Sequence, residues 1–571
     1  MKKIIVGICF VLMIPMAASA WDYAYFDEVN LIIVPKLILR MDKEASSMSN
    51  PALLDLKSDY EVIIGPYYQG NSTKISTNYS HKIDPSGISA PDAYSSGNSR
   101  GTYTTNIWGT DLGFALKLND LSSLGLVFNY ENSTLKGNED FSTSWDLNLP
   151  FINSGYFDGA IDRDVRKNTF SLAALYDLDI SDTLSLGAGL KYAYITEKHD
   201  DDMYGTGVWE VGSIPETADT DLTVKYGYHL VRPMIGLSSR PMDVLSLNAS
   251  VSPGFRWGTV DRDGSYYDDI FGPAGFGLIP AGESLTNTED LKSHDLFGWD
   301  IDASVQPTFI MNDALSFPVL VKFYYGDFGY NLDGPIDGYF ATYDYPAVFR
   351  GPGSIEYDVS DEFWYITAGP GVDYSWKIFD FSSMVSYTRC EFSHTYDQVN
   401  NVVSSLVFIA NPIDGLTFFH QQDKLVLDVI SVDLGVAGAF SDVFSASFGV
   451  TYDFGWAARK YSHRSSSPYI SPEGTVQTIT MDKDTDTYQD LTLNASLSYR
   501  PPINGLMFSL SGMVKIPLEK MAFDMDGSTT YNVDTTTLGF FWPYGLGDPT
   551  YRGYSSQGWD YGGMLNVTYE F

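Results

Sequence analysis

Long stretches of this chain alternate apolar residues with small polar ones, and this alternation limits the folds that the chain can adopt. In residues 444–456 every second residue is apolar or aromatic, and the residues between them are Ser, Gly, Thr and Asp. Successive side chains of a β-strand point to opposite faces, so such a strand has one apolar and one wet face. The pattern recurs in residues 184–194, 245–257, 491–499 and 559–571. The sequence therefore predicts an all-β fold built from amphipathic strands.

Short turn-forming segments separate these strands in pairs. Tyr60–Tyr68 is expected to be the first strand and Trp559–Phe571 the last. With seven hairpins between them the total is about sixteen strands, within a range of roughly 14–18, and an even number places both ends on the periplasmic side. The seven turn segments are residues 118–120, 180–182, 240–243, 311–313, 379–380, 441–442 and 501–504,.

Long polar segments alternate with the short turns. Residues 133–164, 260–295 and 331–361 are examples, and we expect them to be loops. Short turns on one side and long loops on the other are typical of outer-membrane barrels. The fold class that follows is an antiparallel transmembrane β-barrel with short periplasmic turns and long extracellular loops. Five prolines fall inside expected strands, where each removes a ladder donor and predicts a bulge or kink: Pro233, Pro253, Pro307, Pro318 and Pro370,.

The first twenty residues have the pattern of an export signal. Lys2 and Lys3 precede the apolar run Ile4–Met16, and Ala18-Ser19-Ala20 is a small-residue cleavage site,. The run is too short to span a bilayer as a helix, which takes about 20 residues. We expect residues 1–20 to be removed and the mature chain to be located in the cell outer membrane.

Composition agrees with a barrel and excludes one class of partner. Aromatic residues make up 15% of the chain, as aromatic girdles require,. Of the two cysteines, Cys9 lies in the signal, so Cys390 has no partner for an intrachain disulfide in the mature protein. A formal net charge of −37 would repel nucleic acid,. The expected surroundings are instead outer-membrane lipid and lipopolysaccharide.

The segment 21–58 does not fit the wall of a barrel. It contains the apolar run Leu31–Leu39, followed by Glu44-Ala45-Ser46 and then Asn50-Pro51-Ala52, just before the first strand. In this order and position the segment resembles the N-terminal region of the FadL-type family of long-chain fatty acid and hydrocarbon transporters. The resemblance covers about a dozen residues and the overall plan.

The resemblance implies a mechanism. Members of the FadL-type family fold this segment into the barrel as a hatch, capture hydrophobic molecules from outside and release them sideways through a gap in the wall. On this basis residues 21–58 are expected to be a hatch, residues 59–571 the barrel, and Asn50, Pro51 and Ala52 the hatch motif. Hydrophobic small molecules such as fatty acids are the expected substrates.

The final strand carries a second family-level feature. Tyr569 and Phe571 end an alternating strand in an aromatic residue. This resembles the terminal signature of proteins that the outer-membrane barrel assembly machinery inserts. We therefore expect Tyr569 and Phe571 to be an assembly signal, and that machinery to be a partner.

Other functions remain open on the sequence. Small polar residues on the expected inner faces also suit a general porin for polar solutes, and long aromatic and acidic loops suit an adhesin or receptor without transport. No metalloprotease, nucleophile-elbow or phosphate-loop motif occurs,. His420 near Asp423 and His463 near Ser465 are the pairs that could serve a barrel enzyme. We expect no enzyme, no catalytic residue, no cofactor and no metal site.

Overall fold

A computed structural model of the chain describes most of the expected barrel. It describes residues 50–54, 56, 59–83, 93–149, 152–209, 214–270, 284–341, 348–404, 413–466, 477–503, 505–519, 521–531 and 546–570. The expected signal peptide, the apolar run Leu31–Leu39 and the terminal Phe571 lie outside these residues. No helix in the described ranges is long and apolar enough to cross a membrane.

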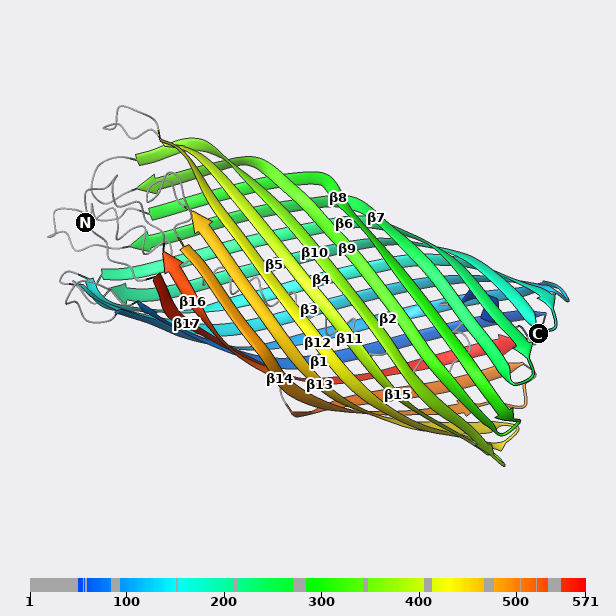
Figure 1. The fold of residues 1–571 in the computed structure, drawn as a ribbon. Helices are drawn as coiled ribbons and strands as arrows, with labels where there is room; N and C mark the ends of the chain where they lie inside the picture. The colour runs from blue at the N-terminus through cyan, green and yellow to red at the C-terminus, as the bar shows by residue number, and fades with distance from the viewer. Residues whose placement is uncertain are drawn as a thin grey trace.

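One antiparallel sheet contains all the described strands (Figure 1). A short 3-10 helix, η2 (Pro51–Leu53), precedes it. The strands are β1 (Tyr60–Ile83), β2 (Ala93–Asn119), β3 (Ser122–Leu149), β4 (Ile152–Ser181), β5 (Leu184–Trp209), β6 (Ile214–Met242), β7 (Leu245–Ile270), β8 (Ser284–Asn312), β9 (Leu315–Ala341), β10 (Val348–Trp376), β11 (Phe379–Ser404), β12 (Ile413–Ser441), β13 (Phe444–Ser466), β14 (Gln477–Tyr499), β15 (Leu506–Glu519), β16 (Met521–Tyr531) and β17 (Leu546–Glu570).

The sheet closes on itself, because β1 pairs with both β2 and β17. β15 and β16 follow one another in a single position of the wall, and each pairs with β14 on one side and β17 on the other. The 17 described strands therefore occupy sixteen positions around the barrel. This confirms the expected fold class and strand number, and closure of the sheet leaves no strand without a neighbour on either side, as a membrane-spanning sheet requires.

Tight turns join the strands at the end where the C-terminus lies, which we call the turn end (Figure 1). The opposite end is the loop end. All seven expected hairpins form. The turn expected at residues 379–380 lies two residues earlier, at Lys377-Ile378, where Lys377 has a left-handed φ of 59°.

The strands are far longer than the alternation indicated. β4 has 30 residues, and a strand of that length is roughly 100 Å long at ~3.3 Å per residue,. A transmembrane strand needs only about 9–11 residues. The polar segments that we expected to be loops are largely strand: β3 and β4 together cover most of residues 133–164. These halves of the strands were missed because they are polar on the outside, like a soluble sheet.

β6 shows this change of character along one strand. Near the turn end Ile235 is 63% exposed on the outer face, and Arg232 faces inward. Toward the loop end the outer face carries Lys225 and Asp221, while Leu222 and Val224 are buried inside. The turn-side half is therefore apolar outside and the loop-side half is apolar inside.

Aromatic rings mark the border between the two halves on the outer surface. Trp108 contacts Tyr130, and His229 contacts Trp257, with ring centroids 5.3 Å and 5.5 Å apart. Such a girdle lies at the interface of membrane and water. Together with the exposed apolar residues on its turn side, it identifies a transmembrane barrel whose loop-side half projects beyond the membrane. The aromatic belt also includes Phe170, Tyr194, Trp299, Tyr325, Tyr387 and Trp456.

The five prolines interrupt the ladder differently from what we expected. Around Pro233 and Pro253, the residues that lie between Val231 and Ile235 on β6 make no ladder pairs with β7. The register of the two strands is nevertheless the same on both sides of this interruption. The same holds beside Pro307 and Pro318 between β8 and β9, and beside Pro370 between β10 and both of its neighbours. Each proline removes its own donor without adding a residue, so no bulge forms at these sites, and the alternative of a kink stays a prediction.

Candidate functional site: the barrel interior

Charged residues line the interior at the level of the membrane. On β6–β9, Arg232 and Arg256 both contact Asp300, which is 1% exposed, and Lys322 lies 3.8 Å from Asp302. The Arg256 guanidinium also contacts the Tyr324 hydroxyl at 3.4 Å. We call this set the basic arc. Its members are Arg232, Arg256, Lys322, Asp300 and Asp302.

The opposite part of the wall is acidic. On β14–β17 the Lys515 ammonium lies 3.1 Å from Asp490 and 3.7 Å from Asp560. Ser431 donates to Asp453 at 2.6 Å, and Thr451 donates to Asp433 at 2.8 Å. This acidic arc of Asp433, Asp453, Asp490, Asp560 and Lys515 has four carboxylates and one cation. The interior at membrane level is therefore polar and carries charge of opposite sign on opposite sides.

The loop-side half of the interior contains two apolar clusters beside buried ion pairs such as that of Arg459 with Asp423. Its first cluster has members on β1–β3 (Ile75, Tyr103 and Leu135) and on β10–β14, and none among the described residues of β15–β17. Because strands lie about 4.8 Å apart, β14 and β1 are too distant along the wall for direct contact. The two groups therefore pack against each other across the interior and narrow it. The β10–β14 members are Phe363, Cys390, Leu425, Leu427, Val429, Ala457, Tyr461 and Tyr488.

The ladder of the wall is interrupted in this half between β8 and β9, as it also is between β14 and the wall position shared by β15 and β16. Glu289 of β8 pairs with Ile336 of β9, and the next pair toward the turn end is Phe297 with Gly329. Residues 290–296 of β8 and 330–335 of β9 make no ladder pairs with each other. On their other sides, β8 stays paired to β7 and β9 stays paired to β10. This β8–β9 gap lies just on the loop side of Phe297 and Trp299, so its unpaired backbone groups avoid the hydrocarbon region, as they must.

Buried apolar side chains fill the β8–β9 gap from within. Leu291 and Leu296 of β8 and Leu332 of β9 are 0–1% exposed. Val260 of β7, next to them, is also fully buried. They belong to a second apolar cluster on β5–β10, which we call the gap cluster. A molecule that enters here would meet apolar side chains and few polar groups.

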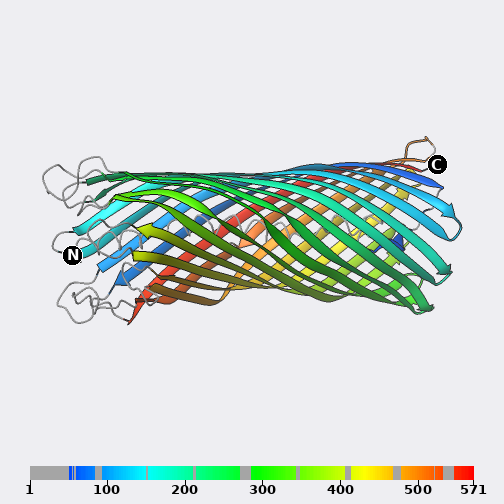
Figure 2. The same ribbon diagram turned by 90° about the horizontal axis from the view of Figure 1, so that it is seen from above.

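The expected hatch motif lies on the inner wall near the turn end. The Asn50 side-chain nitrogen donates to the Leu237 carbonyl at 3.1 Å, and Asn50 Oδ1 caps η2 by accepting from the Ala52 amide. Leu54 and Leu56 pack with Leu175 and with residues of β2 and β6. Figure 2 shows this dark blue segment inside the barrel close to the turn end.

Glycines on the wall make room for this segment. Gly187 of β5 and Gly236 of β6 face inward, and a Cβ at either would overlap Ala52 or Asn50. A Cβ on Gly125 would touch Leu54 at 3.2 Å. The wall is thus shaped to fit Asn50–Leu54. Residues 21–49, the rest of the expected hatch, lie outside the described part of the chain.

The candidate pair His420 and Asp423 does not form. His420 and Asp423 lie on opposite faces of β12: His420 bonds to Asp397 outside, and Asp423 pairs with the buried Arg459 inside. Two other histidines bond to carboxylates, His394 to Asp361 at 2.7 Å and His199 to Glu197 at 2.6 Å. Pairs of this kind are ordinary interior ion pairs, and we assign them no catalytic role.

Ion pairs within the projecting half are strong. Glu197 faces the interior on the loop side of the aromatic belt, 3.3 Å from Lys167. Burial alone would raise the pKa of Glu197, but Lys167 and His199 beside it hold the pKa well below its usual value,. The carboxylate therefore stays ionised at any physiological pH.

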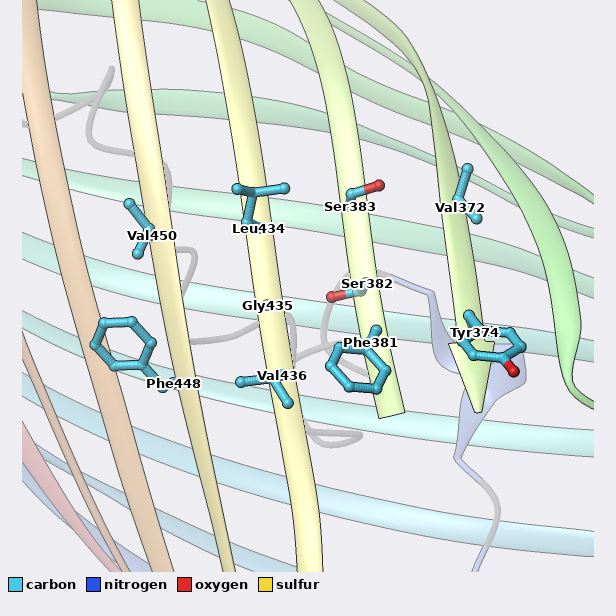
Figure 3. A pocket seen from close by; sticks show the side chains of 10 residues that line it. All are labelled: Val372, Tyr374, Phe381, Ser382, Ser383, Leu434, Gly435, Val436, Phe448 and Val450. Atoms are coloured by element: carbon cyan, nitrogen blue, oxygen red, sulfur yellow. The ribbon is translucent and has the colours of Figure 1, made fainter. Parts of the chain in front are cut away.

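No group of three or more potential metal ligands occurs among the described residues. A groove of about 400 Å³ lies on β10–β13 (Figure 3). Its large residues, such as Tyr374, Phe381 and Leu434, are exposed on the lipid-facing surface, so it faces the membrane and not the interior. Of the expected assembly signal, Tyr569 pairs with Val62 and Leu506.

Comparisons with known proteins give distant structural alignments. The sequence matches no protein-family model, and it matches no curated protein. Among solved structures, a FadL homologue of Pseudomonas aeruginosa aligns at 12% identity over 92% of this chain and 94% of that chain, with a TM-score of 0.32. The toluene transporter TodX of P. putida aligns at 11% identity over 92% and 94%, with a TM-score of 0.28.

A third alignment is similar. The toluene transporter TbuX of Ralstonia pickettii aligns at 10% identity over 92% of this chain and 93% of that chain, with a TM-score of 0.25. TM-scores of this size do not establish a shared fold, so the function of this chain follows from its own residues.

Proposed function

We propose that this protein is an outer-membrane transporter that takes up hydrophobic small molecules such as fatty acids. The observation that carries the proposal is the pair of apolar clusters inside the loop-side half, one of which borders the interrupted β8–β9 ladder. These clusters are built from side chains such as Leu, Val and Tyr, and the buried charged groups beside them, such as Arg163 and Arg459, are held in ion pairs. Apolar lining with few polar groups is what a site for hydrophobic ligands requires.

In the proposed route a hydrophobic molecule enters at the loop end, packs among the apolar clusters and leaves sideways through the β8–β9 gap at the outer border of the membrane, from where it partitions into the bilayer. Straight passage is disfavoured, because Asn50–Leu54 occupies the inner wall at the turn end and a charged belt lies in between. Sideways release is also what the resemblance of the N-terminal segment implies. The segment 21–58 acts as the hatch in this proposal.

Uptake assays separate hydrophobic from polar transport. Bacterial cells that express the protein are expected to take up radiolabelled palmitate about tenfold faster than cells without it, a difference of roughly 1.4 kcal/mol in the barrier. A radiolabelled disaccharide, measured in parallel, is expected to show no increase. Equal acceleration of both solutes would contradict the proposal and indicate a general porin.

A porin is the second candidate, because the interior at membrane level is polar. Lys322 of the basic arc is 41% exposed within the barrel, so water reaches this level. Barrels of 16–18 strands are wide enough to hold an aqueous channel. In this alternative the two apolar clusters would only narrow the channel.

Ion selectivity tests the charges of this inner wall. The acidic arc has a net charge of −3, four carboxylates against Lys515 alone, so a current through the barrel is expected to favour cations,. In a tenfold KCl gradient the reversal potential should lie toward that of K⁺. The variant Asp433→Asn/Asp453→Asn is expected to move it toward zero, whereas Asp120→Asn, in a turn outside the interior, should not. Chloride selectivity in the parent protein would refute this assignment.

A further inference from the structure

Three contacts inside the barrel pass over the β8–β9 gap and join the strands on either side of it. The hydroxyl groups of Tyr226 (β6) and Tyr330 (β9) are 3.3 Å apart. The Arg262 guanidinium (β7) lies 4.4 Å from the ring centroid of Tyr357 (β10). The rings of Tyr228 (β6) and Phe328 (β9) are 6.0 Å apart. Each contact skips two strands of the wall.

The register shows that the first two contacts lie directly over the unpaired backbone, and that the Tyr228–Phe328 contact lies at its turn-side border, where Phe328 pairs with Gly298. Arg262 pairs with Leu291 on one edge of the gap, and Tyr357 pairs with Leu332 on the other. The guanidinium thus reaches across both leucines. In the same way Tyr226 pairs with Val260, which pairs with Ser293, and Tyr226 reaches Tyr330 beyond them.

We propose that these six residues form a clasp that closes the β8–β9 gap from the inside and thereby controls access of hydrophobic molecules to it. The inference rests on the proposed function for its transport role, but the closing of the gap does not. The clasp residues are Tyr226, Tyr228, Arg262, Phe328, Tyr330 and Tyr357.

The chemistry of the clasp suits a closure that can open. A ladder of backbone hydrogen bonds across residues 290–296 would fix β8 to β9, as it does on either side of the gap. The clasp replaces it with one hydroxyl pair, one cation–π contact and one ring contact, which are individually weak. Arg262 also acts electrostatically on Tyr226 and Tyr330, so the first two contacts are coupled. An apolar molecule that packs among Leu291, Leu296 and Leu332 would compete with these weak contacts.

Cysteine labelling tests the clasp without relying on transport. A reporter cysteine replaces Leu332, which is 1% exposed, in a Cys390→Ser background. The reagent is N-ethylmaleimide, which is small and uncharged. The clasp variant is Tyr226→Phe/Arg262→Lys, which removes one hydroxyl and the planar guanidinium but keeps the charge and nearly all of the volume.

A matched control removes the same groups elsewhere. In Tyr103→Phe/Arg459→Lys, a buried tyrosine loses its bond to Glu139 and a buried arginine loses its bidentate pairing with Asp423, both far from the gap. We expect the reporter to react about tenfold faster in the clasp variant than in the parent, and at the parental rate in the control. Each single substitution is measured as well, so that a folding defect of one double variant leaves the comparison intact.

The outcomes separate the clasp from the transport proposal. Equal labelling of the clasp and control variants, or fast labelling already in the parent protein, would overturn the clasp. Faster labelling together with faster palmitate uptake supports both proposals. Faster labelling in cells that take up no palmitate in any form supports the clasp and refutes hydrophobic transport.

Discussion

Deletion of residues 21–57 is expected to convert a small single-channel current into a large one. The deletion removes Asn50–Leu54, which covers the inner wall of β4–β6 at the turn end, where the first apolar cluster has no member. A barrel with sixteen wall positions is wide enough for water once that space is free,. We expect a conductance increase of about tenfold in planar bilayers, given the channel sizes of such barrels. Large currents in both forms would mean an open porin, and the hatch proposal would fall.

A point variant makes the same test without shortening the chain. In Gly187→Ala the new methyl group would overlap the backbone of Ala52, so the segment must leave its seat on β5. The control is Gly113→Ala, also on the inner face, where the nearest atom, Ile63 Cβ, is 3.4 Å away. We expect part of the current increase in Gly187→Ala and none in Gly113→Ala. Parental current in Gly187→Ala, with increased current after deletion, would place the obstruction in residues 21–49.

The second large effect is expected at Gly505, in the last turn. Gly505 has a φ of 77°, and its carbonyl accepts a hydrogen bond from the Glu570 amide at 2.8 Å. A Cβ at this position would overlap the Glu570 carbonyl, a backbone atom that cannot move without disturbing the β15–β17 pairing. The left-handed conformation alone costs an L-residue about 1–2 kcal/mol. Gly505→Ala is therefore expected to lower the free energy of unfolding by about 2 kcal/mol or more.

Urea unfolding in detergent micelles, followed by the heat-dependent gel mobility of the folded barrel, measures this effect. Gly512→Ala is the matched control in the same hairpin, because its Cβ would meet only the Gly562 carbonyl at 3.6 Å. The midpoint of Gly512→Ala should stay near that of the parent. A midpoint for Gly505→Ala equal to that of the control would show that the turn tolerates a side chain and that the last hairpin can relax.

The alternation of residues such as 444–456 was sufficient to predict the barrel and about sixteen strands, because lipid requires an apolar outer face on every strand,. The loop-side halves escaped prediction for a physical reason. On β6, Lys225 and Asp221 occupy the outer phase that Ile235 occupies nearer the turns. The apolar residues of the outer face disappear from the sequence at this point, and the pattern therefore predicts that the strand ends there.

The interior of the barrel was only partly predictable. Small polar inner residues indicated a wet lumen, and this holds at membrane level, where the structure adds the two charged arcs. No local sequence pattern indicated the gap between β8 and β9, because the gap depends on missing pairs between residues that are about forty positions apart in the chain. The first apolar cluster likewise joins Ile75 to residues on β10–β14, a contact that no local pattern contains. The hatch role of residues 21–58 and the assembly role of Tyr569 and Phe571 stay predictions.

The change of character along each strand has a consequence for how the barrel finds its alignment. Along one strand the apolar side chains lie on the outer face near the turns and on the inner face near the loops. If one strand slipped by one residue, Ile235 would turn inward to the charged lumen and Leu222 outward to water in the same movement,. A register shift is therefore destabilising in both halves at once, and the projecting half adds to the free-energy difference that selects the correct register in the membrane.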